Sequence, residues 1–64
     1  MDKKEEILVT MTELFAQKGY NTSMSDISKK VGIKVQSIYS HYESKDQIVY
    51  LVLKKEIFTL LYFF

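Results

Sequence analysis

Helix start and stop signals constrain the fold of this chain more than any other feature of its sequence. Three pairs of residues place a side-chain oxygen three positions before an acid or amide, which lets side chains bond the free N–H groups of a first helical turn. These pairs are Asp2 with Glu5, Ser23 with Asp26, and Ser44 with Gln47. Gly19 and Gly32 stand where the first two helices should end, because glycine adopts positive φ without strain. The signals predict helices over about residues 3–18, 24–31 and 35–42, and a fourth helix that begins near residue 45.

The spacing of apolar residues supports these helices. In the first segment they recur at the intervals of a core-facing helix, as Ile7, Leu8, Met11, Leu14 and Phe15. No segment sustains the alternation of polar and apolar residues that is typical of a strand. Because 64 residues suffice for one small domain, we expect a single all-α domain.

Composition excludes several classes of function. The chain has no cysteine and one histidine, so it holds no disulfide, iron–sulfur cluster or thiolate zinc site, and a histidine-based metal cage is not expected. No glycine-rich phosphate loop, inward carboxylate pair or nucleophile beside a base is evident. We therefore expect neither an enzyme nor a metal site, and no cofactor in this chain.

Targeting signals are also absent from the sequence. The first six residues carry charges of both signs and lack the apolar core of a signal peptide. The longest apolar run, residues 48–53, is six residues long, far short of the roughly 20 that span a bilayer. We expect a soluble, cytoplasmic protein with no membrane partner.

The predicted fourth helix differs from the others. Residues 48–53 are apolar in every direction around a helix, and residues 57–64 add a second, aromatic-rich stretch. A helix that is apolar all round has partners on several faces, and the first three helices can cover only one of them. Two interpretations stay open: a small oligomeric or swapped protein and, as we favour, a domain of a longer chain.

Residues 24–43 have the size of a helix-turn-helix motif with its turn at Gly32. Ser28 is small where the two helices would approach closely. Four apolar residues are spaced to fix the helices against each other, namely Ile27, Val31, Ile33 and Ile38. The pattern alone also fits any short helical hairpin.

A more specific resemblance is carried by several short segments. They read Thr22-Ser23-Met24-Ser25-Asp26-Ile27, Val31-Gly32-Ile33, Ser37-Ile38-Tyr39-Ser40-His41-Tyr42 and Ser44-Lys45, preceded by Lys18-Gly19-Tyr20. Together they closely resemble the N-terminal domain of the tetracycline-repressor (TetR) family, over about residues 7–53. The Tyr-x-His-aromatic-x-Ser-Lys run is the most specific part.

The resemblance implies a homeodomain-like three-helix bundle with a helix-turn-helix, followed by a fourth, connecting helix. It implies a transcriptional regulator, in most members a repressor, that binds a palindromic operator in double-stranded DNA as a homodimer at the bacterial nucleoid. Residues 1–47 would then be the DNA-binding domain, and residues 48–64 the start of the helix towards a C-terminal domain absent from these residues. That domain would dimerise and bind a small-molecule inducer.

Residues of the third helix are candidates for base contacts. Because Ile38 must face inward, Gln36, Ser37 and Ser40 fall on the outer arc. Gln36 can pair with an adenine edge and Ser37 with several bases, although both can equally be ordinary solvated surface. Val35 can touch a thymine methyl group or pack on the core.

Further residues are assigned to the DNA backbone by the resemblance. Tyr39, His41 and Lys45 occupy positions that bind phosphates in the family, and each carries a donor. Lys34 stands where an N-cap oxygen is usual, so helix stability is exchanged for a charge that can reach a phosphate. The start of the second helix faces phosphates across the groove through Thr22, Ser23 and Ser25, the last also near a base edge. The alternatives are plain surface positions, packing of Tyr39 on the core rim, and N-capping by Ser23.

The net charge of +1 conceals an uneven distribution. Residues 14–34 carry four lysines against one aspartate, and this positive segment brackets the expected DNA face. No arginine or lysine occupies the base-reading positions of the third helix. Because arginine on guanine is the commonest specific contact, we expect recognition that depends on A·T pairs and DNA shape. The competing hypothesis is a helical protein–protein interaction module that docks through its fourth helix.

Overall fold

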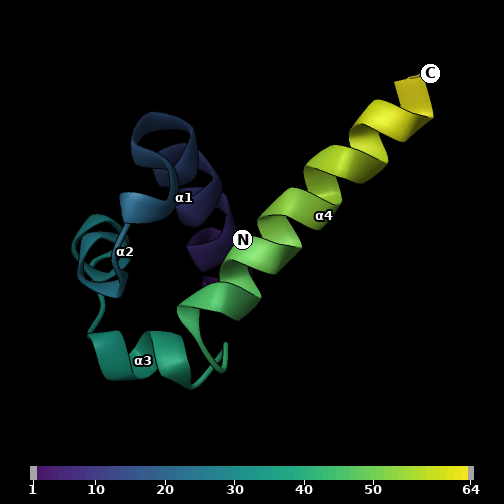
Figure 1. Ribbon diagram of the computed structural model, residues 1–64. Helices are drawn as coiled ribbons and strands as arrows, with labels where there is room; N and C mark the ends of the chain where they lie inside the picture. The colour runs from purple at the N-terminus through teal and green to yellow at the C-terminus, as the bar shows by residue number, and fades with distance from the viewer. Residues whose placement is uncertain (1, 64) are drawn as a thin grey trace.

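Four α-helices and one short 3₁₀ turn make up the computed structural model, which describes the backbone of residues 2–63 and the side chains of residues 2–54. The elements are α1 (Lys3–Lys18), η1 (Gly19–Asn21), α2 (Met24–Val31), α3 (Val35–Tyr39) and α4 (Lys45–Phe63). Residues 2–63 contain no strand, so the predicted all-α fold is confirmed. The first helix contacts both α2 and α4, and α2 contacts α3 (Figure 1).

The predicted N-caps of α1 and α2 are both present. An Asp2 carboxylate oxygen accepts a hydrogen bond from the Glu5 N–H at 2.8 Å. At α2, Ser23 Oγ accepts from the Asp26 N–H at 3.1 Å, and Asp26 Oδ2 accepts from the Ser23 N–H at 3.0 Å. This reciprocal pair satisfies N–H groups that a helix cannot satisfy by itself. Local sequence therefore determines where both helices begin.

The start of α4 uses a variant of the same arrangement. Ser44 Oγ accepts from the Gln47 N–H at 3.2 Å, as predicted. The Gln47 Oε1 accepts from the N–H of Glu43, one residue before the cap, at 2.6 Å. The capping residues consequently bind the loop after α3 as well as the first turn of α4.

Gly19 and Gly32 end α1 and α2 with φ angles of 65° and 85°. The N–H groups of Gly32 and Ile33 share the Ser28 carbonyl oxygen, at 2.8 and 3.1 Å. A residue with a Cβ atom is strained in this region of φ, so both turns select glycine through backbone conformation. The two predicted helix ends are confirmed.

The third helix is three residues shorter than predicted, because it ends at Tyr39. The Ser40 hydroxyl donates to the Ser37 carbonyl oxygen at 2.6 Å. In a continuing helix that carbonyl would accept from the His41 N–H, which donates instead to the Ile38 carbonyl at 3.0 Å with a tighter, 3₁₀ spacing. Competition from a serine side chain thus coincides with the early end of α3.

One hydrophobic core lies between the helices. The Tyr42 hydroxyl donates to the Lys4 carbonyl oxygen at 2.8 Å, which ties the loop after α3 to the first turn of α1. The buried apolar side chains of the core are Ile7, Met11, Leu14, Met24, Ile27, Ile38, Tyr42, Ile48, Val49 and Val52.

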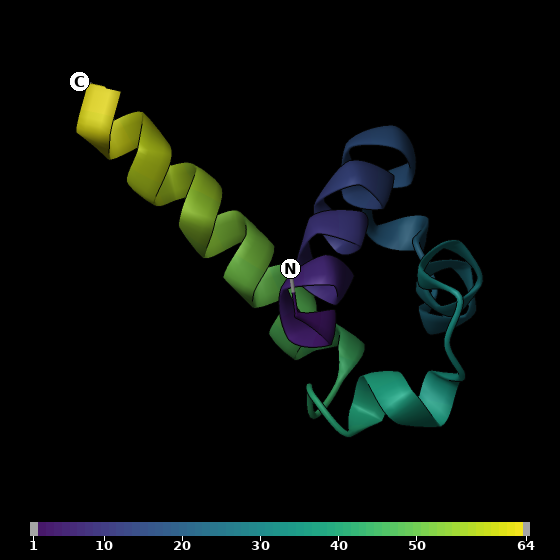
Figure 2. The same cartoon turned by 180° about the vertical axis from the view of Figure 1, so that it is seen from behind.

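The fourth helix packs on this core at its start and then leaves it. Ile48, Val49 and Val52 are buried, whereas Tyr50 is 61% exposed. Both ribbon views show the second half of α4 projecting beyond the other helices (Figures 1 and 2). The apolar stretch predicted for residues 57–64 lies outside the described side chains. Within the described part of the chain, no helix has the length and apolarity needed to cross a membrane.

Candidate nucleic-acid interface

The second and third helices and the turn between them form a helix-turn-helix. Ser28 of α2 is buried, and its hydroxyl donates a hydrogen bond to the Ser25 carbonyl oxygen at 2.8 Å. The four apolar side chains predicted to hold the motif together all pack in the core or against it. Ile27 and Ile38 are fully buried, and Val31 and Ile33 are half-buried.

One side of α3 faces the core and the rest faces outward. Ile38 has no exposed surface, while Gln36 and Ser40 are exposed and Ser37 is half-buried. Val35 is half-buried and packs against the core, and its contact with a thymine methyl group stays a prediction. The helix and its C-cap residue together present a short polar face made by Gln36, Ser37 and Ser40, which we call the α3 polar face.

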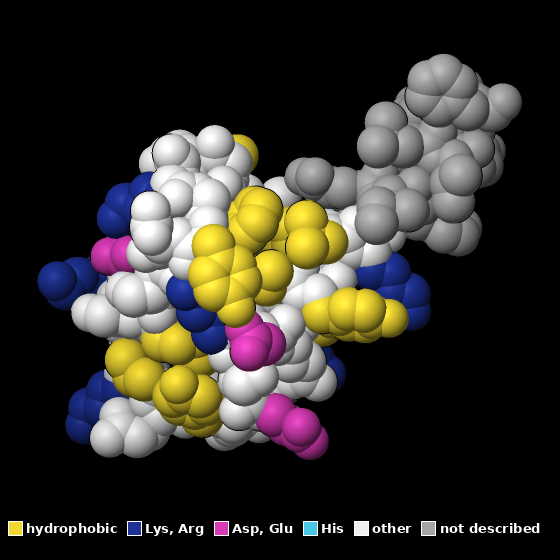
Figure 3. All heavy atoms as spheres, viewed as in Figure 1, with side chains coloured by type: hydrophobic (Ala, Val, Ile, Leu, Met, Phe, Trp, Pro, Cys, Tyr) yellow, Lys and Arg dark blue, Asp and Glu magenta, His cyan; other side chains and the backbone are white. Residues whose placement is uncertain are grey.

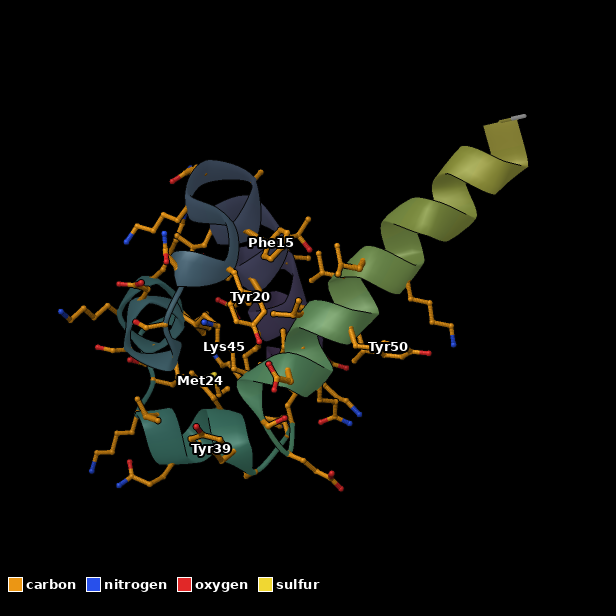
Figure 4. The ribbon with its side chains drawn as sticks, viewed as in Figure 1. Phe15, Tyr20, Met24, Tyr39, Lys45 and Tyr50 are labelled. Carbon is orange, nitrogen blue, oxygen red and sulfur yellow. The ribbon has the colours of Figure 1, made fainter. Side chains whose placement is uncertain are left out.

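Tyr39, His41 and Lys34 flank the α3 polar face, and all three are exposed. Tyr39 is half exposed, so its ring is not packed away on the rim of the core (Figure 4). Lys34 immediately precedes α3, and no side-chain oxygen caps this helix, as its sequence predicts. These positions are open to a ligand as large as a nucleic acid.

The start of α2 differs in part from what we expected. Thr22 is fully buried, and its Oγ1 donates to the Gly19 carbonyl at 3.1 Å, so its side chain lies inside the turn rather than on the outer surface. Ser23 is half-buried and serves as the N-cap of α2. Ser25 is exposed. Of these three residues, Ser25 therefore offers the most accessible side chain.

Lysines surround α2 and the start of α3 in the space-filling view (Figure 3). Two of the four lysines in the positive segment form ion pairs: Lys18 with Asp26 at 3.3 Å and Lys30 with Glu13 at 3.2 Å. The pKa of Asp26 is lowered chiefly by hydrogen bonds from the Ser23 N–H and hydroxyl, and then by Lys18. The other two lysines of the segment, Lys29 and Lys34, are exposed.

A contact that sequence reasoning missed fixes the side chain of Lys45. Its Nζ donates to the Tyr20 carbonyl oxygen at 2.6 Å and lies 4.4 Å from the centroid of the Tyr20 ring (Figure 4). The Tyr20 hydroxyl donates to Asp46 Oδ1, and this bond together with the charge of Asp46 raises the pKa of Tyr20. No local sequence pattern predicts this contact, because Tyr20 and Lys45 are 25 positions apart in the sequence. The resemblance includes Tyr20 but assigns it no role.

Comparison with known protein families identifies the family to which this sequence belongs. The sequence profile of the tetR family of bacterial regulatory proteins matches residues 7–50, which contain the helix-turn-helix and the first turn of α4. The chain belongs to the tetR family. The matched residues are those of the N-terminal DNA-binding domain of this family, and they include every candidate interface residue from Thr22 to Lys45.

The sequence is also similar to individual transcriptional regulators of the tetR family. The chain is 46% identical over 46 residues to the HTH-type negative transcriptional regulator IcaR of the icaADBC biofilm operon from Staphylococcus epidermidis. It is 44% identical over 46 residues to the protein of the same name from Staphylococcus aureus strain Newman. Each alignment covers 70% of this chain and 25% of the relative, so the matched region spans about a quarter of these curated proteins. No solved structure matches the chain.

Proposed function

We propose that this chain is the DNA-reading part of a transcriptional repressor and that α3 lies in the major groove of an operator half-site. The observation that carries the proposal is the α3 polar face: burial of Ile38 turns Gln36 and Ser40 outward, in a domain whose family binds DNA. An α-helix fits the major groove, where each base pair presents a distinct set of donors and acceptors. In this arrangement the Gln36 amide forms hydrogen bonds with an adenine, and the Ser37 hydroxyl can donate to or accept from any of several bases.

The residues around the α3 polar face have the chemistry to hold the DNA backbone. Tyr39, His41 and Lys34 are exposed and donate hydrogen bonds, as phosphate contacts require. We assign Ser25 and Lys45 the same role at the starts of α2 and α4. Both helices are long enough for their N-terminal dipoles to favour phosphate.

We further propose that the functional species is a homodimer. One domain of this size reads a single half-site, and two-fold symmetry of a dimer matches a palindromic operator. The staphylococcal relatives are named as negative regulators, which supports repression as the outcome of binding. On this proposal residues 1–47 read DNA in the cytoplasm, and the helix from residue 48 leads to an inducer-binding, dimerising domain.

Titration of labelled duplexes at several salt concentrations tests DNA binding. Fluorescence anisotropy with palindromic and mixed-sequence duplexes gives the association constant at each concentration. We expect log K to fall linearly with log[salt], with a slope of about −0.9 for each phosphate neutralised. Binding that does not respond to salt, or no binding at low ionic strength, contradicts the proposal.

A second candidate function, docking to another protein through α4, has one observation in its favour. Tyr50 and Leu53 are exposed on this helix. Single exposed apolar residues are nevertheless common on soluble domains. Replacing both with serine separates the two functions, because DNA binding should be retained by this double variant and protein docking should be lost.

A further inference from the structure

We propose that Tyr20 is a positioning residue for DNA binding, which holds the ammonium group of Lys45 in place to receive a phosphate. The inference rests on the proposed DNA-binding function and adds to it a residue outside the helix-turn-helix. Its basis is that two consecutive residues of the first turn of α4, Lys45 and Asp46, both bind this one tyrosine.

The three contacts involve different parts of Tyr20. Its carbonyl oxygen accepts from Lys45 Nζ at 2.6 Å, its ring lies 4.4 Å below the same ammonium, and its hydroxyl donates to Asp46. The first turn of α4 is therefore fixed relative to η1, which directly precedes α2. A shift of α4 relative to η1 would disturb these contacts.

The backbone that carries the Tyr20 carbonyl is itself well supported. Thr22 donates to the Gly19 carbonyl twice, from its N–H at 3.2 Å and from its Oγ1 at 3.1 Å. Thr22 is fully buried, so this turn is packed as well as hydrogen-bonded. The acceptor for Lys45 is consequently part of a turn that is held by hydrogen bonds and by packing.

The geometry leaves Lys45 able to bind DNA. An ammonium group has three N–H donors, and the Tyr20 carbonyl accepts one of them. The side chain is half-buried, so part of it still meets solvent. A free lysine loses much rotamer entropy when it binds a phosphate, whereas a lysine already held in one conformation loses less. Tyr20 thus increases DNA affinity without touching the DNA.

Tyr20 is well suited to mutation, because its side chain is not part of the core. It is 59% exposed, and substitutions at such sites usually change stability little. The chain also supplies a matched control. Lys54 Nζ lies 5.9 Å from the centroid of the Tyr50 ring, and both residues of this pair lie on α4, further along the helix from the helix-turn-helix.

The decisive experiment is a double-mutant cycle in DNA affinity. Tyr20→Leu removes the ring and the hydroxyl, and Tyr20→Phe removes the hydroxyl alone. We expect Tyr20→Leu to weaken binding about two- to five-fold, the effect of losing one exposed cation–π contact, and Tyr20→Phe to weaken it less. In a Lys45→Gln background, Tyr20→Leu should have almost no further effect, and Tyr50→Leu should have almost none in either background.

A DNA-independent measurement accompanies the cycle. The Tyr20 ring should shift the Lys45 Hε protons upfield in NMR spectra of the wild-type chain and of Tyr20→Phe, and Tyr20→Leu should abolish the shift. Thermal melts of each variant verify that it is folded. If Tyr20→Leu does not fold, the inference is judged by two results. These are the upfield Hε shift in the wild-type chain and in Tyr20→Phe, and a small loss of DNA affinity in Tyr20→Phe.

The possible failures are distinguishable. If the wild-type chain binds no duplex in a salt-dependent way, the proposed function fails and the inference fails with it. If the wild type binds but Tyr20→Leu has the same effect in both Lys45 backgrounds, the function stands and the inference is overturned. Unchanged or tighter binding by Tyr20→Leu, or the absence of the upfield shift, overturns it as well.

Discussion

Gln36 has the side chain on α3 best suited to choose between bases, since its amide both donates and accepts hydrogen bonds. We expect Gln36→Ala to reduce discrimination at one base pair by about 1–3 kcal/mol. Because Gln36 is exposed, the free energy of unfolding should change by less than about 0.5 kcal/mol. Anisotropy titrations against duplexes that differ at single positions measure this discrimination.

The control for Gln36 is Lys45→Ala, which removes a proposed phosphate contact. This variant should weaken binding to all duplexes alike and reduce the salt slope by about 1. A uniform loss of affinity from both substitutions would refute the division of roles between the two residues.

Asp26 gives the stability of the domain a defined pH dependence. The Ser23 N–H, the Ser23 hydroxyl and then Lys18 lower the pKa of Asp26 in the folded state. The folded state therefore favours the ionised carboxylate, so this contribution to stability is present above the unfolded pKa of about 3.9 and is lost as pH falls through the folded pKa. Urea titrations at several pH values should show the free energy of unfolding decreasing below about pH 4. The decrease should be smaller for Asp26→Asn, and an identical decrease in both proteins would contradict this assignment.

At the level of elements, α3 combines a weak start with an early end. Lys34 precedes it without a side-chain cap, so a serine at this position should stabilise the helix. We expect Lys34→Ser to raise the free energy of unfolding by about 0.5–2 kcal/mol, the usual range for an N-cap. The same variant should bind DNA less tightly, with a salt slope smaller by about 0.9.

Lys34→Ala separates the two effects, because it removes the charge without adding a capping oxygen. It should match Lys34→Ser in DNA binding and show no gain in stability by urea denaturation. Stabilisation of equal size in both variants would show that capping is not its cause.

The boundaries of the elements show how far sequence reasoning extends. The starts of α1, α2 and α4 and the ends at Gly19 and Gly32 depend on residues within four positions of each other, and all were predicted. The end of α3 was not predicted; it coincides with a hydrogen bond from the Ser40 hydroxyl to the Ser37 carbonyl, which the backbone would otherwise use. Helix periodicity carries no information about that competition.

For the candidate site, the predictable part was which side of α3 faces outward. Burial of Ile38 sets this orientation, and the spacing of apolar residues in the sequence predicts it. The positions of Thr22 and Lys45 were not predictable, because each depends on the turn at residues 19–21. Contacts between residues 25 positions apart in sequence follow from helix packing and leave no local pattern.

For the whole molecule, one small core supports the helices that carry the candidate interface. Ile38 joins α3 to that core and has no exposed surface. We expect Ile38→Ala to lower the free energy of unfolding by about 2–5 kcal/mol, a large part of the 5–15 kcal/mol typical of a domain. Thermal unfolding followed by circular dichroism should show one cooperative transition at a lower temperature, with α1 and α4 lost together with α3.

Ile33→Ala is the matched control for Ile38→Ala, since Ile33 is half-buried at the edge of the same core. Its melting temperature should fall by less than that of Ile38→Ala. A separate, earlier transition in Ile38→Ala, with α1 still protected from amide hydrogen exchange, would show that α3 is not held by the common core.

The single buried anchor of α3 has an evolutionary consequence. A helix of five residues is too short to be stable alone, so its shape depends on the attachment through Ile38 and on the turns at its ends. Gln36 is exposed and lies outside the core, whereas the exposed Ser40 bonds the Ser37 carbonyl at the end of the helix. On the proposed function, substitutions at Gln36 should therefore change operator preference at almost no loss of stability, so that specificity at this position can evolve independently of the fold.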